Sequence, residues 1–432
     1  MLKKFYTLFL LLFIPAAGFC GVAGGSILFY PKLSLSGAYA DTAFQYYTYE
    51  RPYKSAAAVV ELPVHILMGN NFYADINYFV RADYNKNISM EDGVFYTYNF
   101  QNANLNYQND LLAIKLGRQG YQSRNKDFVI YYGGYDGRRD NIAPTALDAA
   151  RHSLKTKYFS YDLLLGREVK KLSFYDDDSL VYGATAGFNL ADILGLDIFY
   201  YGRNTSFGAS DYKISVYGAG AELNIEDSLS ISLYAAKNCG EKIYHFMGMT
   251  SKTDIRGYAV NGALKIPGEN SLGKTLYAVN IYYGSPQSGG DSMPFVPISQ
   301  NMDRGYVFGG MDIIRYAAAP RQLSGNLPFG ADITDLMIYS LTYNLDLDYP
   351  RYISLGGGIY NFAATSSHFT SRDLGSELDL NITYKKGPLA LTAYYGLFIS
   401  GSGLGAATGL PGTPAGGKIQ KLGLHFSYEF MI

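Results

Sequence analysis

The chain has 432 residues, a formal net charge of −1 and no tryptophan, but 42 tyrosines and 25 phenylalanines. A charge this close to neutral gives no bulk basicity for binding nucleic acid, so we expect no nucleic-acid partner. Only two cysteines occur, and one lies in a segment that we expect to be removed, so no internal disulfide is predicted.

The N-terminal segment 1–23 has the features of a secretory signal peptide. Two lysines precede an apolar core over residues 5–14, which is too short to cross a bilayer as a helix. We expect cleavage after Ala23, with Gly18 as a second choice of site; a lipid-modified Cys20 is the alternative. The remaining residues, 24–432, are predicted to form one outer-membrane β-barrel domain.

The rest of the chain holds no apolar run near 18 residues, which excludes a helical membrane protein. Strand-like alternation recurs instead, and short polar or Gly/Pro-containing turns are predicted at 69–71, 108–110, 191–192, 226–228, 267–270, 349–351 and 386–388. Longer segments fall between them, at 85–93, 121–134, 169–178, 239–251, 285–330 and 401–417. Short turns at one end and long loops at the other are typical of an outer-membrane barrel.

Counting strands between these connections predicts the size of the barrel. With a periplasmic N-terminus, a first strand over 32–49 and a last over 418–432, the pattern gives about eighteen strands. This even number requires a sixth strand near 135–142 and a further periplasmic turn near 143–152. It also requires 303–316, although strand-like, to lie in the long outer loop.

The predicted fold class is therefore all-β: a transmembrane antiparallel up-and-down β-barrel with short periplasmic turns and long outer loops. A secreted β-sandwich is the alternative that alternation alone leaves open. Apolar residues of 72–83, 194–203, 376–384 and the terminal run 422–432 occupy alternate positions and should face lipid, where a Lys or Arg costs about 2–4 kcal/mol near the midplane. The other positions should line a wet interior of mixed charge, with Arg81, Asp197, Arg203, Glu377 and Asp379 among them.

Three stretches together resemble the alginate-export-like outer-membrane porin family. The first is Leu-Gly-Arg-Gln at 116–119, the second Tyr-Asp-Gly-Arg-Arg at 135–139, and the third the strand pair at 374–401. The segment around residues 310–312 also fits a loop of that family. The resemblance covers roughly residues 111–142 and 303–432.

This resemblance implies a monomeric outer-membrane pore that passes a polyanionic polysaccharide through an arginine-rich constriction. Carried over to this chain, it places Arg118, Gln119, Asp136 and Arg138 near the constriction and Glu377 and Asp379 on a strand that lines the pore. Simple alternation puts Arg118 on the lipid side, so a bulge at Gly117 would be needed to turn it inward.

Other chemistry receives little support. The five histidines are scattered without metal-ligand spacing, and no Gly-x-Ser-x-Gly motif occurs. Asp176 to Asp178 are interpreted as a solvated acidic loop and Cys239 as a free thiol in a loop. We therefore expect no enzyme activity, no cofactor and no metal.

The sequence thus predicts a porin-like channel for passive transport of small or polymeric solutes, anionic polysaccharide among them. The alternative is a barrel plugged by 121–134 and 285–330 that acts as a surface adhesin, receptor or structural protein. The expected location is the outer membrane of a Gram-negative-type cell. The expected partners are its lipid, the barrel-assembly machinery and the solute.

Overall fold

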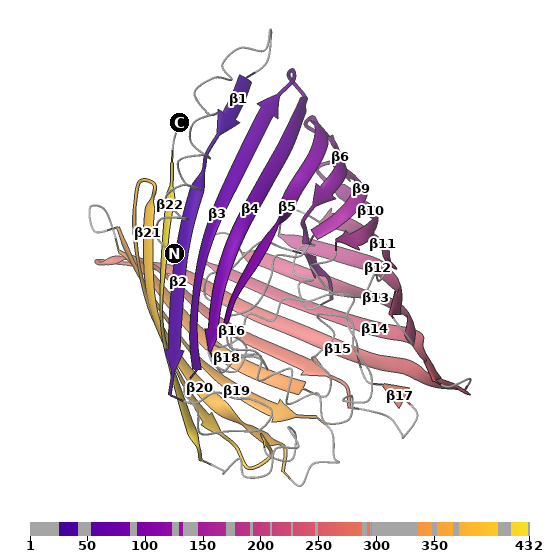
Figure 1. Ribbon diagram of the computed structural model, residues 1–432. Coiled ribbons are helices and arrows are strands. Elements are labelled where there is room, and N and C mark those ends of the chain that lie inside the picture. The colour runs from indigo at the N-terminus through magenta and orange to yellow at the C-terminus, as the bar shows by residue number, and fades with distance from the viewer. Residues whose placement is uncertain are drawn as a thin grey trace.

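The strands of the protein close into a single barrel (Figure 1), here seen in a computed structural model. The structure describes residues 26–41, 53–86, 93–122, 129–132, 146–169, 178–190, 193–207, 210–225, 228–246, 249–286, 292–293, 295, 336–347, 352–365, 371–404 and 416–430. The barrel closes where β2 pairs antiparallel with β22, so the indigo and yellow ends of the chain lie side by side.

Eighteen antiparallel strands form the wall, as the sequence predicted, each paired with its neighbours around the barrel. They are β2 (Lys32–Ala40), β3 (Tyr53–Leu67), β4 (Phe72–Lys86), β5 (Gly93–Gln108), β6 (Leu112–Gln119), β9 (Ala146–Lys155), β10 (Phe159–Val169), β11 (Asp178–Leu190), β12 (Leu194–Phe207), β13 (Ser210–Ile225), β14 (Leu229–Phe246), β15 (Met249–Asn270), β16 (Gly273–Gly284), β18 (Leu336–Leu347), β19 (Ile353–Ala364), β20 (Asp373–Lys386), β21 (Leu389–Ser400) and β22 (Lys418–Glu429).

Four short strands complete the described structure: β1 (Ser26–Phe29), β7 (Tyr121–Gln122), β8 (Tyr131–Tyr132) and β17 (Ser292–Met293). β1 extends the wall along β3, β7 pairs with β8, and β17 pairs parallel with β15. No helix in the described part of the chain is long and apolar enough to cross a membrane.

One end of the barrel carries only short connections, such as 68–71, 109–111 and 387–388; we call it the short-turn end. The other, the long-loop end, carries the connections 41–52, 120–145 and 285–335 among others. This asymmetry confirms the predicted pattern of short turns and long loops.

The predicted turn near 143–152 is wrong. β9 covers most of these residues, and the chain turns at 156–158 instead. The Thr156 hydroxyl donates to the Phe159 carbonyl (2.8 Å) and accepts from the Phe159 N–H (3.0 Å). A single Thr therefore stabilises a turn that has no Gly, Pro, Asn or Asp to reveal it in the sequence.

The predicted long loop 239–251 is also wrong, because β14 and β15 run through it and leave only residues 247–248 between them. Cys239 consequently lies in β14 between Ser215 and Arg256 of the neighbouring strands; it is a free thiol and exposed. The predicted first strand is confirmed for its portion in β2. The signal peptide, 42–49, 135–142 and 303–316 lie outside the described residues.

Alternation along each strand separates an outward apolar face from an inward face. In β22, Leu422 and Leu424 are each 57% exposed whereas the adjacent Lys421 is fully buried. Aromatic rings flank the outward apolar band at both ends, as expected for a barrel that meets two membrane–water interfaces. They include Phe72, Tyr107, Tyr277 and Tyr343 at the short-turn end and Tyr39, Tyr84, Tyr217 and Tyr258 at the long-loop end.

Candidate functional site

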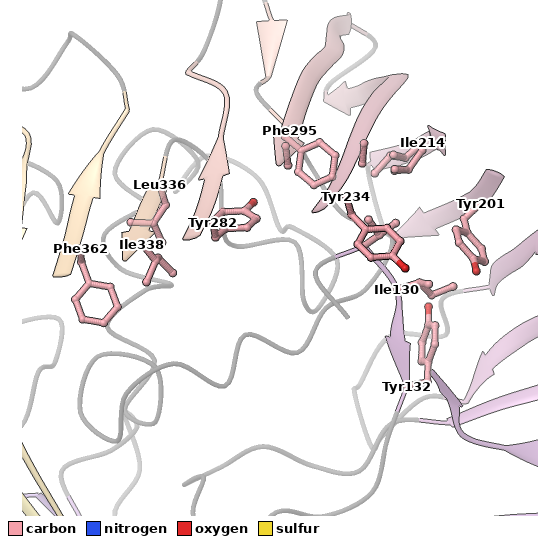
Figure 2. Packing of buried hydrophobic residues seen from close by; sticks show 14 of the residues in the cluster. Ile130, Tyr132, Tyr201, Ile214, Tyr234, Tyr282, Phe295, Leu336, Ile338 and Phe362 are labelled. Carbon is pink, nitrogen blue, oxygen red and sulfur yellow. The ribbon is translucent and has the colours of Figure 1, made fainter. Parts of the chain in front are cut away.

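The inward face of the wall changes character along the barrel. Toward the long-loop end most of its side chains are apolar, nearly all of these are fully buried, and they belong to one cluster (Figure 2); buried polar side chains such as Arg203, Glu377 and Lys421 lie among them. The cluster includes Ala40, Leu147, Val181, Ile214, Val216, Ala236, Ile255, Ala259, Tyr282, Leu336, Ile338, Phe362, Phe398 and Ile419. Because these residues come from strands all around the barrel, the inner side of the wall is covered at this end and packs like a protein core.

Toward the short-turn end the inward face is polar, and most of its side chains are partly or fully exposed, although Asn104 and Asn106 are buried. The partly or fully exposed ones include Lys265, Lys274, Asn280, Asn344, Asp346, Asn381, Thr383, Thr392, His425 and Glu429. Across β3, β4 and β5, Asp75 bonds His65 (2.5 Å) and the amide of Asn106 (3.1 Å). Amides, hydroxyls and charges of both signs make this end of the interior suited to water and polar solutes.

A short hairpin formed by β7 and β8 leaves the wall after β6 and packs against the inside of the barrel. Tyr121 is buried, and its hydroxyl bonds the Tyr201 hydroxyl (3.1 Å), which also bonds Thr185 (2.7 Å). Figure 2 shows Ile130 and Tyr132 of the same segment beside Tyr201 and Tyr234. Residues 121–122 and 129–132 therefore narrow the interior where the apolar and polar ends meet.

A charged pair supports this hairpin from the wall. The Arg151 guanidinium binds Asp162 through Nη2 (2.6 Å) and Nε (3.0 Å) and lies 5.1 Å from the centre of the Tyr121 ring. Arg151 thus holds Tyr121 by a cation–π contact while its own charge is balanced by the carboxylate.

Two further connections reach inward at described residues. Phe295, just after β17, and Leu404, just after β21, are both fully buried in the apolar cluster. Phe295 lies near Tyr234 and Ile214 in Figure 2. Phe295 and Leu404 therefore help to cover the inner side of the wall at the long-loop end.

Among the sequence-predicted residues, Arg81 and Arg203 lie on the inward face and are buried. Nη2 of Arg203 pairs with Glu168 (2.6 Å) and its Nε donates to Thr205 (3.1 Å). Asp197 also faces inward, where it accepts a hydrogen bond from the Tyr234 hydroxyl (3.0 Å).

Glu377 and Asp379 also face inward and are buried, as is Lys421. The register places Asp379 opposite Gly396 of β21, and Gly396 opposite Lys421 of β22. Gly396 has no side chain. At this register position, therefore, no side chain of β21 stands between Asp379 of β20 and Lys421 of β22.

Arg118 and Gln119 separate to opposite faces. Gln119 is fully buried inside, and its amide donates to the Ala149 carbonyl (2.9 Å). Arg118 shares the outward register face of Leu116 and lies opposite Asp148, with no register shift at Gly117. The bulge that would turn Arg118 inward is therefore absent from this stretch of β6.

Arg118 instead links two strands where β6 leaves the wall. Its Nε and Nη2 bind the Asp148 carboxylate of β9 (2.9 and 3.0 Å), and its Nη1 donates to the Asn99 side chain of β5 (2.7 Å). The geometry favours a structural link between β5 and β9. Asp136 and Arg138 lie outside the described residues.

Sequence reasoning missed Tyr121, Arg151 and Asp162. Arg151 fell in a predicted turn and Asp162 on a strand without a motif, so only the pairing of β9 with β10 brings them together. Among the described residues no three His, Cys, Asp or Glu side chains are grouped to hold a metal ion.

Comparison with known proteins supports the fold. No family model and no curated protein matches this sequence. Crystal structures of Pseudomonas aeruginosa OccK11 (OpdR) and Acinetobacter baumannii OccAB4 are similar, at 13% and 9% identity and TM-scores of 0.51 and 0.54. Each match covers 94% of this chain and 96% and 98% of those chains respectively. The structure of A. baumannii OccAB3 is similar at 10% identity and a TM-score of 0.54, over 95% of this chain and all of that chain.

The structural match over nearly the whole length of both chains shows a shared fold. This fold is a closed 18-strand antiparallel β-barrel.

Proposed function

We propose that the protein is an outer-membrane channel through which polar solutes diffuse passively. The single observation that carries the proposal is a closed eighteen-strand barrel whose outward face is apolar and whose inward face is polar and charged at the short-turn end. A barrel of this strand number is wide enough for an aqueous path. The short-turn end would face the periplasm and the long-loop end the exterior.

The path through such a channel is narrowed by the β7–β8 hairpin and by the inward side chains of Phe295 and Leu404. Solutes would cross the polar short-turn end and pass beside these side chains at the long-loop end. We therefore expect a low conductance for a barrel of this size, with size selection at the level of Tyr121 and Arg151.

The solute is the finer part of the proposal. The motif resemblance supports an anionic or polymeric solute such as a polysaccharide, and Arg81 and Arg203 lie on the inward face. Acidic groups of the same face, among them Asp197, Glu377 and Asp379, argue for modest charge selectivity. Residues 118, 119, 136 and 138 remain predicted constriction positions, of which the geometry favours Gln119 over Arg118.

Single-channel recording of the purified, folded chain in planar bilayers tests the proposal. We expect discrete conductance steps, and reversal potentials in a salt gradient that report the charge preference. Ile130→Asp should raise the conductance, because a carboxylate does not remain buried in the apolar cluster and the segment 121–132 would detach. Gln122→Asp, an exposed position of the same segment, is the matched control. A folded barrel that never conducts contradicts the channel.

One observation favours a second function. The continuous apolar cluster at the long-loop end is what a permanently plugged barrel needs, and such a barrel would serve as a surface receptor or adhesin. Deleting 285–330 would then abolish attachment to the external ligand without lowering conductance. In a channel it would instead raise conductance and shift selectivity.

The cellular setting follows from the same proposal. We propose cleavage of residues 1–23, insertion by the barrel-assembly machinery and a monomer in the membrane. The mass of the mature chain checks the cleavage site, since removal after Ala23 leaves residues 24–432. Fractionation of outer from inner membranes checks the location.

A further inference from the structure

Strands β14 and β15 are longer than a membrane crossing requires. They contain 18 and 22 residues, against roughly 9–11 for a tilted spanning strand. On the outward face of β14, Ile231, Leu233 and Ala235 are exposed and apolar, and the next outward residue is Lys237. The apolar band of this hairpin therefore ends at Lys237, and the rest extends beyond it at the long-loop end.

Lys237 stands in a row of aromatic side chains. The register places it directly opposite Tyr217 of β13 on one side and Tyr258 of β15 on the other. Tyr258 in turn stacks on Tyr283 of β16, with ring centres 5.8 Å apart. Tyrosines gather at the level of the lipid headgroups, so this row marks the membrane–water interface on this side of the barrel.

Three outward cations gather at or just beyond this row: Lys213, Lys237 and Arg256, which we call the basic patch. All three are exposed. Among the residues that the structure describes, neither Lys213 nor Lys237 has an ion-pair partner. Two unbalanced ammonium groups therefore face the headgroup level.

The acidic groups of the same surface have partners of their own. Asp254 binds Nη2 of Arg256 (2.7 Å), Glu241 binds Lys252 (2.7 Å), and Asp211 lies 3.4 Å from Nε2 of His245. Glu241 lies opposite Lys213 of β13 in the register, but its carboxylate forms an ion pair with Lys252 of β15. The patch as a whole thus carries net positive charge directly beside exposed Tyr and Leu side chains.

We propose that the basic patch binds the phosphate groups of an outer-leaflet glycolipid, whose acyl chains lie along the apolar positions below it. The order of the surface, from Leu233 through Tyr217 to Lys237 and Lys213, matches the order of acyl chain, interface and phosphorylated headgroup in such a lipid. Lysine side chains at this level extend their ammonium groups to the headgroups, and an anionic lipid gains about fivefold in affinity per cation. The inference rests on the outer-membrane location given under the proposed function.

Lipid retention by the purified barrel tests this binding. The full chain is mixed in detergent with bis-phosphorylated lipid A or with its dephosphorylated form, and bound lipid is measured by native mass spectrometry. We expect retention of the phosphorylated lipid only. The triple variant Lys213→Gln, Lys237→Gln, Arg256→Gln should bind roughly a hundredfold more weakly. A control that removes two outward cations of other strands, Lys54→Gln and Lys418→Gln, should bind as the unchanged chain does.

Equal loss in the control and triple variants, or equal retention of both lipids, overturns the proposal. Cys239 offers an independent readout, because it lies on the same face between Lys237 and Glu241 and is exposed. A fluorophore on Cys239 should be quenched by lipid A that carries a headgroup quencher, and the triple variant should abolish the quenching. If the proposed location itself fails, the chain does not enter lipid vesicles, whereas failure of the patch alone leaves insertion and conductance unchanged.

Discussion

The inward side chains at the two ends of the barrel differ in burial and polarity, although the same strands carry both sets. At the long-loop end, inward residues such as Ile338 and Phe362 are fully buried in the apolar cluster. At the short-turn end, Asn344 and Asp346 of the same strand β18 are exposed. A single strand thus carries buried inward side chains at one end and exposed inward side chains at the other. In this barrel, therefore, an inward-facing side chain is not always in contact with solvent.

The physical reason lies in the width of the barrel. Side chains alone do not fill an eighteen-strand barrel, so apolar inward residues at one end require other segments to cover them. Tyr121, Ile130, Phe295 and Leu404 provide that cover in the described structure. The polar end needs no cover, because water satisfies its amides and charges.

The largest expected loss of stability comes from breaking a buried ion pair at the long-loop end. Arg203→Ala leaves Glu168 as a poorly exposed, unpaired carboxylate and should lower the free energy of unfolding by about 3–5 kcal/mol. Urea titrations of the barrel in lipid vesicles, followed by the near-ultraviolet signal of its tyrosines, measure this loss. A loss below about 1 kcal/mol would mean that water reaches the ion pair. The inward face of the long-loop end would then not be packed like a protein core.

Truncation of apolar side chains sharpens the contrast along one strand. Ile338→Ala should cost about 2–5 kcal/mol, because it opens a cavity between Tyr282 and Phe362 in the neighbouring strands. Asn344→Ala, further along β18 at the short-turn end, should change stability by no more than about 0.5 kcal/mol. Similar losses at both positions would contradict the distinction between the two ends.

A glycine at the boundary between the ends tests how tightly the wall packs. The Tyr234 ring lies over Gly220, where an added Cβ would come within 2.0 Å of the ring. Gly220→Ala should therefore cost about 1–3 kcal/mol and disturb the bond from Tyr234 to Asp197. Gly262→Ala is the control, since a Cβ there meets no atom closer than 3.7 Å and should be nearly neutral.

The smallest effect on stability is expected for an ion pair at the short-turn end. Lys32 and Glu61 are 3.4 Å apart and partly exposed, so Lys32→Ala should cost less than about 1 kcal/mol, and less still in high salt. Thermal unfolding monitored by the loss of the compact form in gel electrophoresis is sensitive enough to rank it below Arg203→Ala. The reverse ranking would contradict the conclusion that the long-loop end is buried and the short-turn end exposed to water.

The sequence predicted the wall more accurately than the contents of the barrel. Alternation placed Arg81, Asp197, Arg203, Glu377 and Asp379 on the inward face, where the structure has them. It failed at the turn held by Thr156, which carries none of the turn residues that mark the other connections. It also failed at the β14–β15 hairpin, where the strands continue through residues that were predicted to form a long loop.

The interior itself was not predictable from local patterns. The link from Arg118 to Asp148 and Asn99 depends on where β6 stops, and the contact of Arg151 with Tyr121 depends on the path of a hairpin that no periodicity describes. Both join residues that lie far apart in the sequence.

By itself, therefore, the sequence determined an eighteen-strand antiparallel barrel, its two faces and its short-turn end, because a period of two and short turns are local properties of the chain. Only the tertiary structure decided which inward side chains are buried, which charges are paired and where the cations of the basic patch gather. Those outcomes depend on loops that return into the barrel and on the register between strands, and both are set by contacts between distant residues.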